Sequence, residues 1–386
     1  MINELVEKEK EQLIRLSQEI HRNPEIGDRE HFACRLLCAY LEDKGFTVIR
    51  NVAGLETAFM ASFSHLEGTP HLVFCAEYDA LPEIGHGCGH NLIAVASVTA
   101  AAALAAAAAD LGCSFRVTVA GSPNEEGRGG KIDLIKAGLF DHVDAAMMFH
   151  PGCSTRIQIT TLACREYFFI FHGQNAHAAC EPWEGRNALD GVILAFNGIN
   201  ALRQHLKDDV RIHGVITDGG QSSNIIPARA AAQICIRSAD NRYLDEVVEK
   251  VFNCARGAAL ASGTELEIRE SGYPYQAMIS NPVLEEIFTE MLPAAGYREV
   301  LNVTEGMGSI DMGNVSRLVP SIHPVLAIAD RFHPSHTAQF AQLCNTPYAY
   351  DTMLAAGKAM AMTAAKLILE PALLKRARIA FHDALS

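Results

Sequence analysis

The sequence contains no tract rich in lysine or arginine and no long uninterrupted hydrophobic run. Its 45 acidic residues outnumber its 32 basic ones, which gives a formal net charge of -13. Without a basic tract, nucleic acid and anionic membranes are not expected partners. The first residues, MINELVEKEKEQL, are charged and amphipathic and lack the apolar centre of a signal peptide. No apolar run approaches the roughly 20 residues that span a bilayer.

Internal repeats and low-complexity linkers are absent as well. The 386 residues are too many for one compact core and predict two domains. Eleven cysteines without a signal peptide favour reduced thiols and a cytoplasmic location. We expect most of them, such as Cys34, Cys38 and Cys235, to be small core residues. The alanine tract at 94–109 predicts a buried helix, because alanine forms helices well but is only weakly apolar.

The most informative segment runs from Cys75 to Asn91 and reads CAEYDALPEIGHGCGHN. It lies between an apolar run and the alanine-rich helix, where open α/β sheets place their sites. Asp79 follows the end of the predicted strand, and Cys88 and His90 lie two residues apart in a Gly-rich turn. A thiolate, an imidazole and a carboxylate together suit a metal ion. The plainer interpretation is a loop with an incidental cysteine and histidine.

The order of strand, polar loop and helix recurs along the chain. A predicted strand at 115–120 precedes Glu125 and Glu126, and one at 145–149 precedes His150. A later strand, 325–329, precedes a loop with His333 and His336. Such alternation predicts an α/β fold with a mostly parallel sheet, whose loops converge on one edge. Their donor atoms suit two divalent cations that share one water.

Several alternatives remain open from the residues alone. One of the adjacent glutamates can bind metal while the other carries a proton, or both can be solvated surface charges. His150 follows an apolar strand and can equally be a core histidine. Chemistry does not rank His333 against His336. A Cys88 nucleophile is disfavoured, because His90 is too close in sequence to serve as its base and no oxyanion motif accompanies it.

The pattern changes between about Cys164 and Tyr275. Predicted elements there follow the order β-α-β-β-α-β, which is the ferredoxin-like arrangement. We therefore predict an α/β catalytic domain formed by residues 1–163 and 276–386. An inserted α+β domain, 164–275, interrupts it.

Seven motifs occur in the order found in metallopeptidase family twenty. The chain resembles its aminoacylase and amidohydrolase branch, which includes auxin-conjugate hydrolases, aminobenzoyl-glutamate hydrolases and N-acyl-amino-acid deacylases. The resemblance extends over essentially the whole chain, from Asn23-Pro24-Glu25 onward. The motifs are EYDALP at 77–82, GCGHN at 87–91, PNEEG at 123–127, FHP at 149–151, AHAA at 176–179, NIIP at 224–227 and HT at 336–337. Two departures are Asn124, where the branch often has alanine, and HTAQF in place of HSPxF, which bears on pocket shape.

The resemblance implies a two-metal catalytic domain with an inserted lid that also forms a homodimer. It assigns the metal ligands to Cys88, His90, Glu126, His150 and His336, and so favours His336 over His333. Glu125 would be the general base and acid, and Asp79 the carboxylate that orients the site. The resemblance also implies that His177 stabilises the oxyanion and that Asn224 and Arg237 hold the substrate carboxylate.

The expected reaction is hydrolysis of the amide bond in small N-acyl amino acids or related amino-acid conjugates. Glu125 would take a proton from the attacking water and pass it to the leaving amine. The two divalent ions would be Zn²⁺, Mn²⁺ or Co²⁺, since all three tolerate such ligands. One alternative is a dipeptidase or carboxypeptidase with the same site. Another is a metal-stabilised binder of amino-acid conjugates, which would not need Glu125, Asp79 and His177 together.

Overall fold

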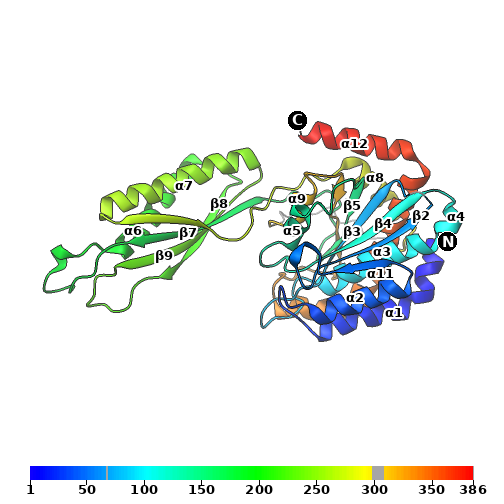
Figure 1. Ribbon diagram of the computed structural model, residues 1–386, viewed down its shortest axis with the longest axis horizontal. Helices are drawn as coiled ribbons and strands as arrows, with labels where there is room; N and C mark the ends of the chain where they lie inside the picture. The colour runs from blue at the N-terminus through cyan, green and yellow to red at the C-terminus, as the bar shows by residue number, and fades with distance from the viewer. Residues whose placement is uncertain (67, 298–307, 386) are drawn as a thin grey trace. The chain divides into compact units, whose positions relative to one another are not determined.

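A computed structural model describes residues 1–66, 68–297 and 308–385 (Figure 1). The described residues divide into two compact units. The first contains residues 1–160, 278–297 and 311–385. The second contains residues 161–277 and 308–310. The predicted insertion, 164–275, lies inside the second unit.

The first unit is built on a six-stranded sheet with the strand order β1-β2-β4-β3-β5-β11. Strand β3 pairs in parallel with β4 and β5, and β5 pairs in parallel with β11. The strands β1 and β2 extend the sheet in antiparallel fashion. The fold is therefore the predicted α/β class with a mostly parallel sheet. The strands are β1 Thr47–Arg50, β2 Phe59–His65, β3 His71–Glu77, β4 Phe115–Ser122, β5 Ala145–Met147 and β11 Ser321–Ile322.

Strand β3 is the centre of this sheet and is buried along its whole length. Its continuous apolar run is typical of a parallel strand covered on both faces. The chain continues from β3 to β4 on one side and later to β5 on the other. Strand order therefore reverses around β3, and open α/β sheets bind ligands at such a point, outside the carboxyl ends of the strands. The next strand along the chain, β6 His150–Gly152, pairs in parallel with β12 Val325–Ala327 and forms a separate two-stranded sheet.

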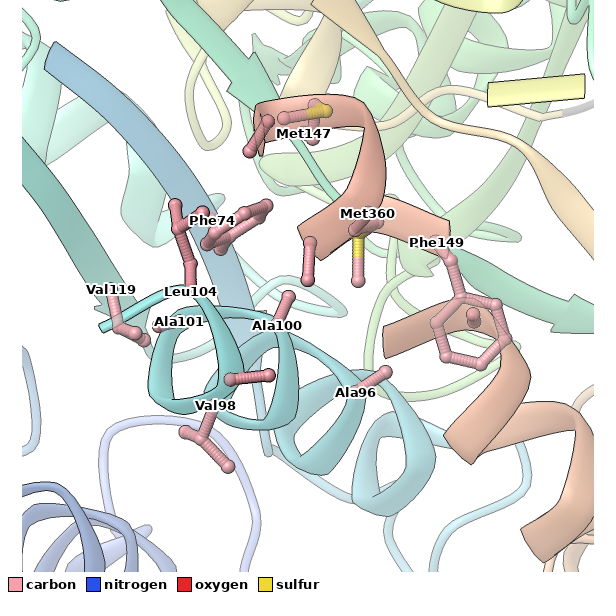
Figure 2. Close-up of a cluster of buried hydrophobic side chains, with 14 of the residues drawn as sticks. Phe74, Ala96, Val98, Ala100, Ala101, Leu104, Val119, Met147, Phe149 and Met360 are labelled. Carbon is pink, nitrogen blue, oxygen red and sulfur yellow. The ribbon is translucent and has the colours of Figure 1, made fainter. Parts of the chain in front are cut away.

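The alanine-rich segment forms helix α3, His90–Ala106, which packs against β3 and β4 and against helix α11, Pro347–Leu369. Figure 2 shows Ala96, Ala100 and Leu104 among the apolar side chains of this core. Small residues allow helices α3 and α11 to approach each other closely. A Cβ added at Gly357 of α11 would lie only 2.8 Å from Cβ of Thr99 in α3. The predicted buried helix is confirmed, although a break at Ala107 separates α3 from α4.

The remaining helices of the first unit surround this core. Within the described residues, only α11 is long and apolar enough to cross a membrane by length and composition, and 83% of its most apolar window is buried in the structure. Helices α9, α10 and α12 were not predicted from the sequence. Besides α3, the helices of this unit are α1 Ile2–Arg22, α2 His31–Asp43, α4 Ala108–Leu111, α5 Gly130–Lys136, α8 Pro282–Met291, α9 Met312–Val315, α10 Ala338–Leu343, α11 Pro347–Leu369 and α12 Pro371–Leu385.

The second unit is a four-stranded antiparallel sheet with the order β10-β7-β9-β8 and two helices on one face. Its elements follow the predicted β-α-β-β-α-β order. Alternate β9 residues such as Ile234 and Ile236 face the helices, so Cys235 and Arg237 belong to the other face. The elements are β7 Ala163–His172, α6 Ala188–Leu202, β8 Arg211–Asp218, β9 Arg229–Ser238, α7 Asn241–Ser262 and β10 Glu265–Glu270.

Candidate metal centre

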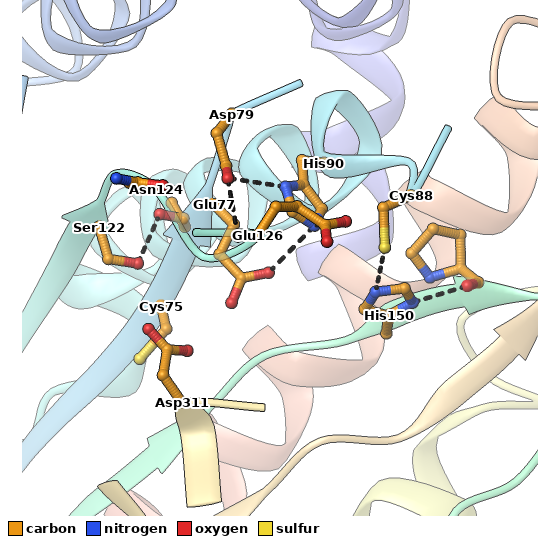
Figure 3. Close-up of polar contacts among 12 residues, drawn as sticks. Cys75, Glu77, Asp79, Cys88, His90, Ser122, Asn124, Glu126, His150 and Asp311 are labelled. Carbon is orange, nitrogen blue, oxygen red and sulfur yellow. Dashed lines mark hydrogen bonds and ion pairs between the residues drawn. The ribbon is translucent and has the colours of Figure 1, made fainter. Parts of the chain in front are cut away.

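The polar side chains of the first unit gather where its parallel strands end. Asp79 follows β3, Glu125 and Glu126 follow β4, and His150 follows β5. His90 is the first residue of α3. Parallel strands β4, β3 and β5 are neighbours, so their carboxyl ends bring these loops to one edge of the sheet (Figure 3).

Asp79 is buried and joins two of the predicted ligands. Its Oδ1 lies 2.8 Å from Nδ1 of His90, and its Oδ2 accepts a hydrogen bond of 3.0 Å from the backbone N–H of Glu126. A carboxylate on Nδ1 fixes the tautomer and orientation of an imidazole and leaves Nε2 for a ligand. Nε2 of His90 is buried and has no hydrogen-bond partner.

Cys88, His90 and His150 form one group of candidate metal donors, whose ligand atoms lie within 4.8 Å of one another. Sγ of Cys88 is 3.4 Å from Nε2 of His150, and Nδ1 of His150 hydrogen-bonds the Pro151 carbonyl. Burial lowers the pKa of His150 to about 4, which keeps the imidazole neutral, the form that binds a metal. Burial raises the pKa of the Cys88 thiol, so a bound cation is needed to form the thiolate.

Cys88, Glu126 and His336 form a second group that shares the cysteine. Nε2 of His336 is 3.1 Å from Oε1 of Glu126. Burial favours a higher pKa for Glu126, but the hydrogen bond from His336 and the charge of His90 outweigh it and lower that pKa to about 2. His333 instead accepts a hydrogen bond from Arg331 at its ring. His336, and not His333, therefore lies with the other donors. Its backbone has a positive φ of 61°, which is strained for a residue other than glycine.

Glu125 belongs to a third group of candidate donors, together with Glu77 and His90. Burial, with the nearby charges of Glu77, Asp311 and Glu126, raises its pKa well above the usual carboxyl range. The preceding Asn124 has a φ of 57°, which asparagine tolerates better than most residues. Its side chain lies against Gly27 and Gly127, since a Cβ at either position would be 2.1 Å from Oδ1 of Asn124. Asparagine therefore shapes the turn that carries both glutamates.

The three predicted substrate-side residues all belong to the second unit. His177 is exposed, and its Nδ1 accepts hydrogen bonds of 3.2 Å from the backbone N–H groups of Ala179 and Cys180. Its Nε2 therefore carries the proton in a neutral ring. Asn224 lies beside it, because its carbonyl accepts from the backbone N–H of Ala178 at 2.9 Å. Arg237 lies farther along β9, where its Nε contacts Sγ of Cys235 at 3.4 Å.

Four buried polar residues near the centre were not predicted. Lys131 contacts both Glu77 and Asp311, and His323 stacks on His150 with ring centroids 5.6 Å apart. Both ring nitrogens of His323 lack a hydrogen-bond partner. One signal was available in the sequence, because Glu77 precedes Asp79 by two residues, the repeat that keeps side chains on one face of a strand. In the structure, His323 follows β11 as His150 follows β5.

The donor set fits divalent cations. It offers thiol, imidazole and carboxylate groups in three overlapping clusters, and the buried Nε2 of His90 has no hydrogen-bond partner. Nitrogen and sulfur ligands with carboxylates suit zinc and its neighbours among the transition metals. A buried donor without a hydrogen bond is costly unless a ligand satisfies it.

This fold and donor set are those of a metal-dependent hydrolase, and the sequence comparison agrees. Residues 73–363 match the model of peptidase family M20/M25/M40, and the chain belongs to that family. It is accordingly a hydrolase of amide or peptide bonds, and family membership implies divalent metal ions. The predicted resemblance to metallopeptidase family twenty is confirmed.

Two curated relatives align along nearly the whole chain. Human Xaa-Arg dipeptidase is 37% identical over 394 residues, which cover 97% of this chain and 90% of the relative. One of the p-aminobenzoyl-glutamate hydrolase subunits of Escherichia coli is 30% identical over 450 residues, which cover 97% of this chain and 92% of that subunit. A Bacillus subtilis protein described as a dinuclear metal-binding peptidase of family M20 has a similar fold, with a TM-score of 0.69 at 17% identity. The superposition covers 94% of this chain and 99% of the Bacillus chain.

Proposed function

We propose that this protein hydrolyses dipeptides and related amino-acid conjugates, with dipeptides that end in arginine as the leading substrates. The observation that carries the proposal is Glu125 next to His90, where three overlapping groups of candidate metal donors meet. Identity to Xaa-Arg dipeptidase supports the substrate class. The net charge of -13 also favours a cationic substrate, because a protein of opposite charge raises the local substrate concentration.

Cys88, His90, Glu126, His150 and His336 would hold the divalent ions. When bound, such ions act as Lewis acids and lower the pKa of a water ligand. Glu125 accepts the proton of the attacking water and passes it to the nitrogen of the leaving amino acid. Its raised pKa suits a group that must both accept and release a proton. Asp79 keeps Nε2 of His90 directed at the ion through the hydrogen bond to Nδ1.

In the second unit, His177 would donate a hydrogen bond from Nε2 to the developing oxyanion, since Nδ1 already accepts two backbone hydrogen bonds. Asn224 and Arg237 would hold the free carboxylate of the substrate. We also propose a homodimer formed through this unit. Strand β8 is an edge of its sheet and exposes Val215 and Ile216, which suits pairing with a second copy.

A substrate screen tests this function. Protein of measured metal content would be assayed for amine release from dipeptides ending in arginine, lysine, alanine and glutamate, with the Glu125→Gln variant as the control for contaminating peptidases. We expect the arginine dipeptides to have the highest kcat/KM. Metal-loaded protein that turns over none of these would instead support a binder of amino-acid conjugates.

Hydrolysis of N-acyl amino acids, including aminobenzoyl-glutamate, is a second candidate. It is favoured by 30% identity to the aminobenzoyl-glutamate hydrolase subunit. The same screen separates the two, because a deacylase prefers N-acetyl or N-aminobenzoyl substrates over dipeptides with a free amino group.

A further inference from the structure

A buried group of three charged side chains lies beside the candidate metal centre. Lys131 is fully buried and contacts Glu77 through Oε1 and Asp311 through Oδ1, the latter at 2.7 Å. The backbone N–H of Lys131 also donates to Oδ2 of Asp311 at 3.0 Å. Glu77 and Asp311 are 2% and 0% exposed. The group thus joins the end of β3, the start of α5 and the residue before α9.

The charges in this group do not balance. One ammonium faces two carboxylates, so these three side chains by themselves carry a net negative charge, which a cation at the neighbouring Nε2 of His90, a proton or a metal ion, would balance. A buried charge without compensation is strongly unfavourable, whereas a single carboxylate would already satisfy Lys131. A further cation next to Glu77 would remove this imbalance.

The second oxygen of Glu77 is directed at the candidate metal centre. Its Oε2 lies 3.7 Å from Nε2 of His90, and Figure 3 marks this contact. That distance exceeds a hydrogen bond, and Nε2 has no hydrogen-bond partner, its other carboxylate neighbour being Oε1 of Glu126 at 4.0 Å. One ion can span the two atoms, because zinc bonds to imidazole nitrogen and carboxylate oxygen are each about 2.0–2.2 Å long.

We propose that Glu77 is a further ligand of the divalent ion held by His90 and binds it through Oε2. Lys131 fixes the carboxylate by donating to the other oxygen, as outer hydrogen bonds commonly do for metal-binding carboxylates. Asp311 holds Lys131 in turn. The inference rests on the proposed metal-dependent function and adds an acidic ligand to the five predicted ones.

Metal titration of the whole protein tests this ligand without relying on activity. Metal-depleted wild type, Glu77→Gln and Glu285→Gln would be titrated with Co²⁺, with calorimetry for affinity and visible absorption for the coordination sphere. Glutamine keeps the shape and still accepts a hydrogen bond from Lys131. We expect Glu77→Gln to bind at least one ion more weakly by at least about 10–100-fold, the range for loss of a hydrogen-bonding partner of a ligand, with a changed spectrum. Glu285, another buried glutamate of the first unit, should have no effect.

Wild-type affinity, stoichiometry and spectrum in a folded Glu77→Gln variant would overturn the assignment of Glu77 and leave the proposed function intact. Absence of any Co²⁺ binding by wild type would overturn both. If Glu77→Gln does not fold, Glu77→Asp takes its place. Aspartate keeps the negative charge, but its side chain is one methylene shorter, so its carboxylate lies farther from the ion. Wild-type Co²⁺ affinity and spectrum in Glu77→Asp would likewise reject the proposal.

Discussion

The carboxylate of Asp79 lies 2.8 Å from Nδ1 of His90, and both side chains are at most 1% exposed. Replacing Asp79 with asparagine preserves the shape of this contact and removes its charge. We expect metal affinity to fall by about 10–100-fold, because the imidazole loses its oriented, more basic form. Asp144→Asn is the matched control, since Asp144 pairs with Arg378 elsewhere in the first unit. Equal losses of affinity in both variants would contradict a specific role for Asp79.

Variants of the adjacent residues Glu125 and Glu126 should distinguish proton transfer from metal binding. Glu125→Gln is expected to lose kcat by about 10²–10⁴-fold, because no group remains to carry the proton, while metal content stays unchanged. Glu126→Gln should lose metal, since Glu126 joins His336 and Cys88 in one donor group. Plasma mass spectrometry of both purified variants measures the difference. Metal loss in Glu125→Gln with retention in Glu126→Gln would reverse the two roles.

Cys88 should react with iodoacetamide more slowly when metal is bound, because coordination occupies its sulfur. Peptide mapping after timed alkylation, with and without a chelator, measures this rate. The exposed Cys180 serves as an internal control, since its rate should not respond to metal. Cys88→Ser should also weaken metal binding. A Cys88 rate that is the same in both states would remove it from the ligand set.

Arg237 should matter for binding more than for chemistry. We expect Arg237→Ala to raise KM by about 10–100-fold with a smaller change in kcat, since a charge-assisted hydrogen bond contributes about 1.5–3 kcal/mol. Amidation of the substrate α-carboxylate should abolish turnover by the wild type. Arg229→Ala, on the same strand but paired with Asp218, is the control. Undiminished turnover of the amidated substrate would reject the carboxylate clamp.

His177 is predicted to act on the active site of the partner subunit. His177→Ala and Glu125→Ala homodimers should each be nearly inactive. In a mixed dimer one active site carries both defects and the other neither. Unfolding and refolding an equal mixture should therefore restore about a quarter of the wild-type rate, because two-fold dimers assort at random. Recovery no greater than the sum of the parents, with mixed dimers demonstrated by mass spectrometry, would exclude sharing.

Local sequence order predicted most of the fold and the strand-end position of the candidate site. Glu126 could be placed because it follows a recognisable strand within a few residues, and His90 because it directly precedes the alanine-rich helix. Lys131 and Asp311 could not be paired, since 180 residues separate them and their contact exists only in the folded chain. Strand β11 has two residues, too few for a period to be read, so the position of His323 after it was missed. Helix α12 begins at Pro371 and buries Leu374, Ala377 and Phe381, a helical spacing that is present in the sequence but was not used.

Two of the candidate ligands, His90 and His336, differ greatly in how firmly the surrounding backbone holds them. His90 begins a helix that is buried from His90 to Ala105, whereas the His336 side chain is 51% exposed and belongs to a loop. Amide hydrogens of α3 should exchange with solvent deuterium only when the first unit unfolds as a whole, while the loop before α10 exchanges through local opening. Release of a bound ion is then expected to begin at His336 and end at His90. The rate of that release would follow local loop opening rather than global stability.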